Sequence, residues 1–385
     1  MGDLTKEFIQ DSQKELNYLK DLKKKFQEDS FKLTNKYEDC HSAIEFYLTK
    51  ELGELGKKVH TGRSRNDQVI VAMRLFAKQN LINFKIENKL VAKTFLKLAK
   101  KHANHQMPGY THLQRAMPSS WGLWFSSYAE SFIDNIDLIN STIDWIDSNP
   151  LGSAAGYGVA LPLDRRQVTK ELGFKRIQLN SLYVQNSRGK YEMQILNTLK
   201  QSMLDVRKFS WDMSLFLSQE FDLMEIDSIY QTGSSIMPNK HNPDVIEILR
   251  ANYSIVAGQS AELENLLSLP SGYHRDLQLT KRSLIASFEI TSKSLKILPK
   301  LINSIKINKS KSDAALAPPL SMSPSIRYIG VSDNTNVASA GTETVFAKYT
   351  VALAPVGVIP SAPAVVKPST NKLTSAAAAP STLAT

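Results

Sequence analysis

Residues 69–103 read VIVAMRLFAKQNLINFKIENKLVAKTFLKLAKKHA, and this stretch decides the fold. Its apolar side chains recur mostly at three- and four-residue steps, which is the spacing of one face of an α-helix. They are Val71, Leu75, Phe76, Leu81, Phe84, Leu90, Val91, Phe95 and Leu98. A helix of roughly 30 residues is about 45 Å long, and the mean helix of a globular protein has only about 11–12 residues. The spacing therefore predicts an unusually long amphipathic helix.

Similar runs recur along the body of the chain, at residues 119–147, 190–226, 243–269 and 282–307. One domain of modest size cannot cover both flanks of several such rods, so we expect an all-α helical bundle that other subunits extend. Pro243 stands where a helix can begin, and Pro299 should kink or end the last long helix. Strand signals in the body are few, and no sheet is predicted there.

Composition excludes several classes of protein. The 385 residues are 42% hydrophobic and 22% charged, which excludes a wholly disordered chain. The sequence contains no apolar run of about 18 residues, which argues against a transmembrane helix. Cys40 is the single cysteine, so neither an intramolecular disulfide nor a multi-cysteine metal cluster is possible. The first residues lack the apolar core of a signal peptide, and we expect a reducing cytosol.

The net charge of +10 is compatible with nucleic acid, an anionic surface or an anionic substrate. The positive charge is scattered apart from three lysines at residues 23–25, which are interpreted as a solvated helix face. The chain shows neither a zinc-finger nor an RNA-binding aromatic signature, so nucleic acid is set aside.

The chain divides into three parts by composition. Residues 1–68 are interpreted as a partial N-terminal helical domain and residues 69–310 as a central helical-bundle catalytic domain. Residues 311–385 contain eight of the 16 prolines and only eight charged residues, without a helical period. They are interpreted as a low-complexity, disordered tail that suggests no chemistry by itself.

Four polar stretches separate the helices. Residues 60–68 (HTGRSRNDQ) place two arginine guanidinium groups and an asparagine amide just before a long helix. Guanidinium groups pair bidentately with carboxylates and the helix N-terminus is partly positive, so this stretch is suited to binding a carboxylate. In residues 108–115 (PGYTHLQR), a histidine is able to exchange protons near neutral pH. For residues 60–68, the alternative is an ordinary helix start capped by Asn66 or Asp67. For residues 108–115, the alternative is a histidine that is hydrogen-bonded within a turn.

The third stretch, residues 232–244 (TGSSIMPNKHNPD), is the most informative. Its glycine and hydroxyls suggest a mobile end and its prolines a stiff one. Lys240 can stabilise a carboxylate whose second charge develops during a reaction, and a serine can abstract a proton if its anion is stabilised locally, by main-chain N–H groups and the lysine. The alternative is a simple proline-bounded linker.

The fourth stretch is residues 269–281 (LPSGYHRDLQLTK). If the chain is helical past Arg275, Gln278 and Lys281 share one face, and with Tyr273 they can bind the polar end of an amino acid. An exposed helix start is the alternative.

These four stretches, in this order, resemble the argininosuccinate lyases of the fumarase/aspartase superfamily. Residues 233–243 resemble the mobile-loop signature of the whole superfamily, whereas residues 60–68 resemble the argininosuccinate lyase form in particular. The resemblance runs from about residue 38 to residue 307. It implies a long central helical domain, a bundle completed by four subunits, and active sites that each take residues from three subunits.

The resemblance also implies residue roles. Ser234 matches the catalytic base, Lys240 the residue that stabilises the carbanion, and His112 a histidine with a supporting or acid role. Glu247 matches the acidic partner of that histidine. Substrate contacts are implied for Arg65, Asn66, Thr111, Arg188, Asn242, Tyr273, Gln278 and Lys281.

The implied reaction is the reversible elimination of L-arginine from argininosuccinate, which leaves fumarate and belongs to arginine biosynthesis. It needs no metal or organic cofactor, and the implied enzyme is a cytoplasmic homotetramer without nucleic-acid or membrane partners. Members of the family carry further residues before Leu4 and a small helical domain after Ile307. Two alternatives therefore stay open: a catalytically inactive structural relative, as the family's lens crystallins illustrate, and a lyase acting on another fumarate adduct.

Overall fold

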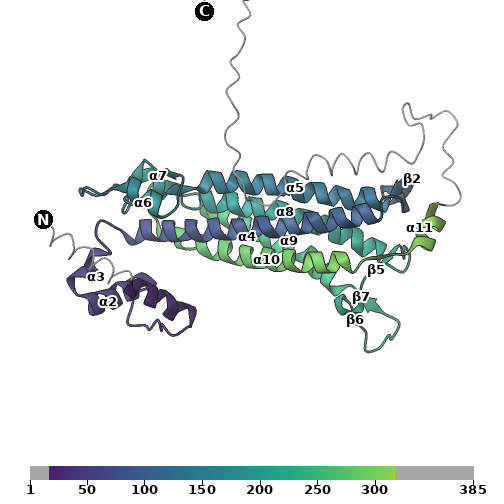
Figure 1. Cartoon of the computed structure of the whole chain (residues 1–385), viewed down its shortest axis with the longest axis horizontal. Coiled ribbons are helices and arrows are strands. Elements are labelled where there is room, and N and C mark those ends of the chain that lie inside the picture. The colour runs from purple at the N-terminus through teal and green to yellow at the C-terminus, as the bar shows by residue number, and fades with distance from the viewer. Residues whose placement is uncertain (1–16, 317–385) are drawn as a thin grey trace, which may run out of the picture.

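The protein is described by a computed structural model that covers residues 17–316. Five long helices run up and down side by side and form an elongated bundle (Figure 1). They are α4 (Arg65–Lys101), α5 (Trp121–Ile146), α8 (Lys190–Phe216), α9 (Asp244–Leu266) and α10 (Thr280–Asn303). The predicted all-α bundle is confirmed. Within residues 17–316, no helix has the length and apolar character that crossing a membrane requires.

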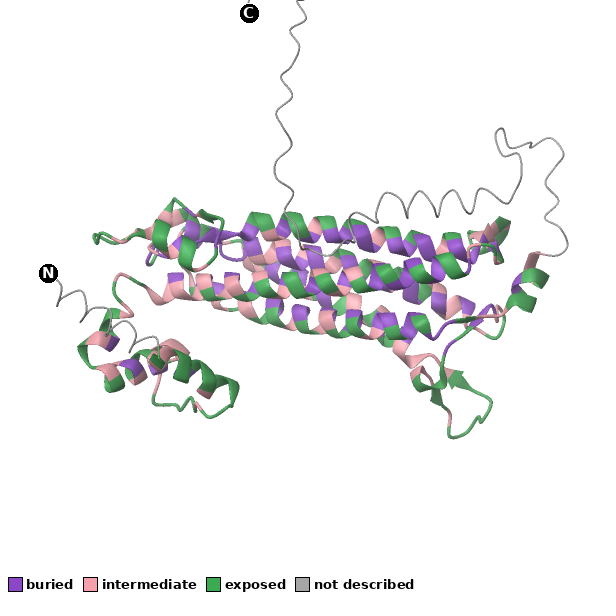
Figure 2. Cartoon of the chain, in the orientation of Figure 1, coloured by how far each residue is buried: buried purple, intermediate pink, exposed green. Residues whose placement is uncertain are grey.

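The core of the bundle lies along the inward faces of these helices, where buried residues gather (Figure 2). Phe95 of α4 contacts the rings of Phe132 on α5 and Phe209 on α8, with centroid distances of 5.9 and 5.1 Å. Trp121, at the start of α5, is fully buried. Burying a large apolar side chain contributes roughly 1.5–3 kcal/mol. Of the periodic positions predicted for α4, Leu81, Phe84, Val91, Phe95 and Leu98 are buried in the bundle, whereas Phe76 and Leu90 are exposed.

Shorter elements connect the long helices at the two ends of the bundle or lie beside it (Figure 1). They are a helix at residues 17–27, α2 (Cys40–Leu52), α3 (Glu54–Lys58), β1 (Gln106–Thr111), β2 (Gln114–Ser120), β3 (Ser148–Asn149), α6 (Arg165–Glu171), β4 (Arg176–Ile177), α7 (Ser181–Asn186), β5 (Met224–Glu225), η1 (Ser228–Tyr230), β6 (Thr232–Gly233), β7 (His241–Asn242), η2 (Arg275–Gln278), β8 (Lys306–Ile307) and α11 (Lys309–Leu316).

The β1–β2 hairpin was not predicted. Its strands pair antiparallel, and the turn between them has positive φ at both His112 (54°) and Leu113 (58°). Such turns usually carry Asn or Gly at these positions. The His-Leu pair gives no turn signal, which explains why the sequence pattern missed the hairpin.

Two helix ends also differ from the prediction. The helix expected over residues 190–226 ends at Phe216, because the backbone turns back at Asp222 (φ 48°) and the Leu223 N–H donates to the Phe216 carbonyl. α10 continues through Pro299 and ends one turn later, at Asn303. The proline therefore does not end the helix.

The secondary structure differs from both predicted boundaries between the three parts of the chain. α4 begins at Arg65, inside the segment assigned to the N-terminal domain. Residues 309–316 form α11 and Ser312 is fully buried, so the prediction of a structureless tail from residue 311 is wrong for residues 311–316. The remainder of that predicted tail lies outside the described residues.

Candidate functional site

The predicted site residues lie at opposite ends of the bundle. We call one the arginine end, which carries Arg65, Asn66, Arg188, Tyr273, Gln278 and Lys281, and the other the serine end, which carries Thr111, His112, Ser234, Lys240, Asn242 and Glu247 (Figure 1). α4 runs from the first end to the second, and its 37 residues span about 55 Å at 1.5 Å per residue. A single chain therefore does not bring the two sets together.

At the arginine end, three predicted residues form a hydrogen-bonded chain. Lys281 Nζ donates to Gln278 Oε1 at 2.9 Å, and Gln278 Nε2 donates to the Tyr273 hydroxyl at 2.7 Å. Gln278 ends the short η2 helix and Lys281 lies in the first turn of α10, so the predicted common face is confirmed. The ammonium and the helix N-terminus together favour an anion here.

Arg188 lies beside this chain, immediately after α7. Its guanidinium is 5.2 Å from the centre of the Tyr273 ring, and the residue is only 5% exposed. Burial lowers the pKa of Arg188, opposed by Glu192 and Tyr273. Arg188 Nη1 is buried and has no hydrogen-bond partner among the described residues. A buried cation with an unused donor is suited to a carboxylate ligand.

Arg65 is already paired. Its Nη1 lies 2.9 Å from Glu38 Oε1, its Nε lies 3.2 Å from Asp39 Oδ2, and its Nη2 donates to Ser42 Oγ at 3.1 Å. The hydrogen bond with Glu38 makes the largest contribution to raising the pKa of Arg65. Its donors are thus held by the segment before and within α2, and a substrate carboxylate must displace or join those groups.

The start of α4 is built around Asp67, which the sequence analysis did not assign to the site. The helix cap is Ser64, whose Oγ accepts from the Asn66 N–H at 3.2 Å, so the alternative of Asn66 or Asp67 as the cap is wrong. The fully buried Asp67 accepts from the Ser64 N–H at 3.0 Å and from the N–H groups of Gly152 and Ala154 at 3.2 and 2.8 Å. The spacing of Ser64 and Asp67 is a capping-box signal that was available in the sequence.

At the serine end, the most informative stretch forms a closed loop. β6 and β7 pair antiparallel, with Thr232 opposite Asn242 and Gly233 opposite His241. Thr232 Oγ1 donates to Asp244 Oδ2 at 2.5 Å, which fastens the base of the loop to the first residue of α9. Pro243 is the residue before α9, as expected from its missing N–H.

Ser234 lies just after β6, at the beginning of the loop. Its Oγ accepts hydrogen bonds from the backbone N–H groups of Ile236 at 3.3 Å and Met237 at 3.1 Å. Two donors that point at one hydroxyl oxygen stabilise its anion more than its neutral form. Main-chain donors of this kind were expected from the sequence, and the geometry provides them.

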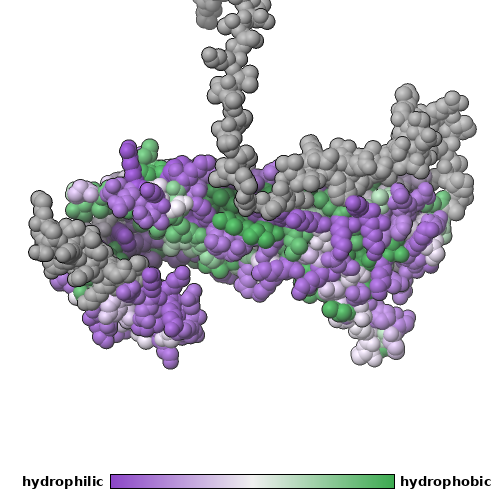
Figure 3. All heavy atoms as spheres, viewed as in Figure 1, coloured by the Kyte–Doolittle hydropathy of each residue, from purple (hydrophilic) through white to green (hydrophobic). Residues whose placement is uncertain are grey.

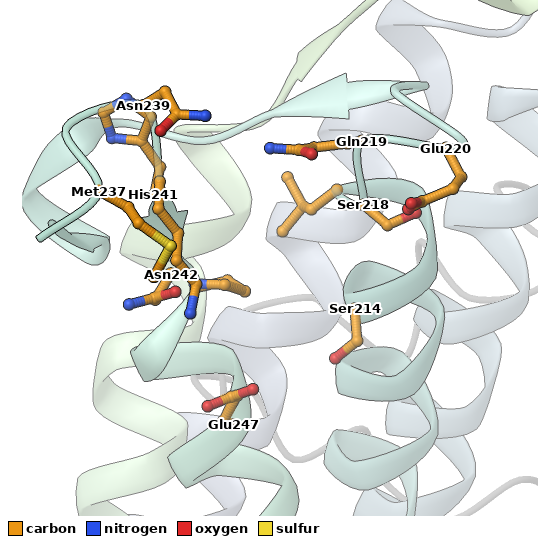
Figure 4. Close-up of a pocket in the computed structure, with 12 residues that line it drawn as sticks. Ser214, Ser218, Gln219, Glu220, Met237, Asn239, His241, Asn242 and Glu247 are labelled. Atoms are coloured by element: carbon orange, nitrogen blue, oxygen red, sulfur yellow. The ribbon is translucent and has the colours of Figure 1, made fainter. Parts of the chain in front are cut away.

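The other end of the loop lines a groove of about 470 Å³ between β7 and the end of α8 (Figure 4). Lys240, Asn242 and Glu247 contribute to one wall, and Ser214 and Ser218 to the other. The groove is open and polar, so it suits a small charged ligand or a segment of another chain.

The predicted pairing of His112 with Glu247 is not made within the chain. His112 and Thr111 are exposed at the tip of the hairpin, whereas Glu247 Oε1 lies 3.9 Å from Arg250 Nη2 on α9. Among residues 17–316, no hydrogen bond or ion pair joins His112 to Glu247. In the same part of the chain, no three His, Cys, Asp or Glu side chains are grouped as a metal site requires.

A pair of neighbouring histidines at the serine end, of which His102 is buried, was also missed. His102 Nδ1 lies 2.9 Å from His105 Nδ1, just before β1, and His102 is 5% exposed. Burial, and to a smaller extent His105 and Lys101, lowers the pKa of His102 from its usual 6.5 to about 4.

The lowered pKa of His102 makes stability depend on pH. Between pH 6.5 and pH 4 the unfolded chain binds a proton at His102 that the folded chain does not. The contribution of His102 to stability is therefore complete above pH 6.5, and about 3 kcal/mol of it is lost on acidification to pH 4. We expect the thermal midpoint to fall less steeply between pH 7 and pH 4.5 in His102→Gln than in the parent protein. Parallel curves for the two proteins would contradict this assignment.

Comparisons with known proteins show which family the sequence resembles. A family model described as lyase matches residues 4–258. Argininosuccinate lyase from Xanthomonas oryzae pv. oryzae (strain PXO99A) is 50% identical over 295 residues, which is 77% of this chain and 68% of that protein. Argininosuccinate lyase from Xylella fastidiosa (strain Temecula1) is 47% identical over 318 residues, covering 83% of this chain and 71% of that protein.

Solved structures share the fold at lower identity. An EDDS lyase in complex with formate has a TM-score of 0.66 and 22% identity, over 71% of this chain and 55% of that chain. A fumarate lyase:delta crystallin from Brucella melitensis has a TM-score of 0.64 and 17% identity, over 78% of this chain and 69% of that chain. The chain thus spans about two thirds of the length of its curated relatives and about half of the EDDS lyase.

Proposed function

The chain belongs to the argininosuccinate lyase family, and from this membership we propose that it catalyses the reversible elimination of L-arginine from argininosuccinate to give fumarate. This is a carbon–nitrogen lyase reaction on a small-molecule substrate. A cytoplasmic enzyme of arginine biosynthesis is the corresponding biological role.

The observation that carries the proposal is the environment of Ser234. The proton to be removed lies on a carbon next to a carboxylate and is only weakly acidic, so the base must be a strong one. A serine becomes such a base when its oxygen anion is stabilised, and the N–H groups of Ile236 and Met237 point at that oxygen.

The remaining groups of the serine end complete the chemistry. Removal of the proton places a second negative charge on the substrate carboxylate, and Lys240, on the same loop, is the cation proposed to stabilise it, with Asn242 donating to the same group. The carbon–nitrogen bond then breaks, and the leaving guanidino nitrogen takes up a proton. We assign that transfer to His112, with Thr111 contacting the substrate. Because His112 and Glu247 are not paired within one chain, the Glu247 that orients this histidine would belong to a neighbouring chain.

The arginine end would hold the rest of the substrate. Argininosuccinate carries three carboxylates, and Arg188, Lys281 and Arg65 are cations with Asn66, Gln278 and Tyr273 beside them. The unused Nη1 of the buried Arg188 supports this role, since a carboxylate would satisfy it.

We further propose that the two ends meet only between chains, in a homotetramer. A distance of about 50 Å along α4 cannot be closed within one chain without unfolding the bundle, but neighbouring chains that run in opposite directions place one arginine end against another serine end. Exposed apolar residues on α4, Ile82, Ile86 and Leu90, follow the helical repeat and supply a surface for such packing. Hydrophobic residues lie at the surface along the bundle (Figure 3).

The proposal is tested by incubating the purified chain with argininosuccinate, adenylosuccinate or aspartate and following fumarate by its ultraviolet absorbance. We expect fumarate, with an equal amount of arginine, from argininosuccinate alone. Turnover of another fumarate adduct but not of argininosuccinate would assign a different lyase activity.

One observation favours a second candidate, a relative that keeps the fold without catalysis. Arg65 is held by Glu38 and Asp39, which compete with a substrate carboxylate. If this pairing blocks the site, no adduct is cleaved although the protein is tetrameric by native mass. The removal of both carboxylates in Glu38→Gln with Asp39→Asn would then restore binding of fumarate.

A further inference from the structure

The segment that follows the last bundle helix contacts β5, which precedes the Ser234 loop, and the β1–β2 hairpin. β8 pairs antiparallel with β5, which puts Ile307 opposite Met224, and the Asn308 N–H donates to the Leu223 carbonyl at 2.9 Å. β5 leads through η1 into β6 and Ser234. The segment after α10 is therefore fixed to the strand that leads into the Ser234 loop.

The same segment then packs against the β1–β2 hairpin as α11. Ser312 is fully buried, and the indole Nε1 of Trp121, at the base of the hairpin, donates to its Oγ at 3.2 Å. Nearer the hairpin tip, Arg115 Nη1 donates to the Ala315 carbonyl at 2.7 Å. These two bonds hold the hairpin at both its base and its outer strand.

The hairpin depends on such contacts because its tip is exposed. Thr111 and His112 are exposed at the turn, so the direction of the tip follows from how the strands below it are held. On the bundle side, Tyr110 packs against Phe221, with ring centroids 5.5 Å apart. α11 is the second support, and it is the one that comes from the far end of the described chain.

We propose that α11 is a brace that positions His112, with Ser312 and Arg115 as positioning residues that act through the hairpin. The inference rests on the proposed function only where it concerns catalysis. A displaced hairpin tip moves the proton donor and one substrate contact, Thr111, while the contacts made by the arginine end are kept, so the brace acts mainly on kcat and only weakly on KM.

The test uses Arg115→Gln and Ser312→Ala in the full chain. In each, we expect kcat for argininosuccinate to fall about tenfold or more with KM within about twofold, and hydrogen exchange of the backbone amides in residues 106–120 to become faster. Ser312→Thr keeps the hydroxyl and should recover most of kcat. Ala314→Ser, at an exposed position of α11, is the control and should behave as the parent protein does.

The outcomes separate the brace from the proposed function. Arg115 is exposed, so its variant folds even if the buried Ser312→Ala does not. Unchanged hydrogen exchange of the hairpin in Arg115→Gln would overturn the brace, and so would faster exchange with an unchanged kcat. If the parent protein cleaves no argininosuccinate, the proposed function fails, and the exchange measurement alone still decides whether α11 holds the hairpin.

Discussion

Replacement of Ser234 by alanine is expected to lower kcat for argininosuccinate cleavage by about 10³-fold. The variant removes the oxygen that accepts from Ile236 and Met237 and leaves both donors in the loop. Because the base acts in the transition state, KM should change little. Steady-state kinetics on fumarate formation measure both quantities.

Ser235→Ala is the matched control, since the neighbouring serine differs in position but not in chemistry. It should keep activity within about threefold of the parent protein. Equal losses in the two variants would mean that the loop tolerates no change, and full activity in Ser234→Ala would remove this serine from the mechanism.

Replacement of Lys281 by methionine is expected to raise KM by about 10²-fold, with a smaller change in kcat. The variant keeps the length of the side chain but removes the charge that faces Gln278 and, through it, Tyr273. A substrate carboxylate then loses its charge-assisted hydrogen bond with Lys281, and the Gln278 amide loses the same partner. Arg282→Met, on the exposed neighbour, is the control and should leave KM unchanged.

If both KM and kcat were unchanged in Lys281→Met, the arginine end would lie outside the site. A fall in kcat with no change in KM would give Lys281 a chemical rather than a binding role. Either result would contradict the assignment made here.

The sequence was sufficient to predict the bundle and the adjacency of Gln278 and Lys281, because both depend on local helical periodicity. The five long helices repeat the apolar spacing of an amphipathic helix, and such helices bury their apolar faces by packing against one another. The contacts of Ser234 with main-chain N–H groups were also foreseeable, since a short glycine- and serine-containing loop leaves its N–H groups unpaired.

Other features could not be predicted because they depend on distant contacts. Arg65 pairs with Glu38 and Asp39 only once α2 has packed beside the start of α4. The burial of His102 depends on where the hairpin and α5 lie. The hairpin itself has a turn without Asn or Gly, so tertiary packing, including that of Tyr110 and Trp121, overrides weak local propensity.

The separation of the predicted site into two ends is the feature with the largest consequence. The sequence pattern assigns Ser234 and Lys281 to one site, whereas the fold places them at opposite ends of the helical bundle. The predicted site and the observed separation are compatible only if several chains contribute to each site. The proposed activity therefore depends on the proposed assembly.

That claim is tested most directly by co-expressing two variants, Ser234→Ala and Lys281→Met, and measuring activity at a substrate concentration far below KM, where each variant alone should keep no more than about 1% of the parent kcat/KM. In randomly mixed tetramers whose sites take the two ends from different chains, we expect about a quarter of the sites to be intact and activity to return to about that fraction of the parent value. Activity no greater than the average of the two unmixed variants would show that both residues of a site come from one chain, or that no shared site exists.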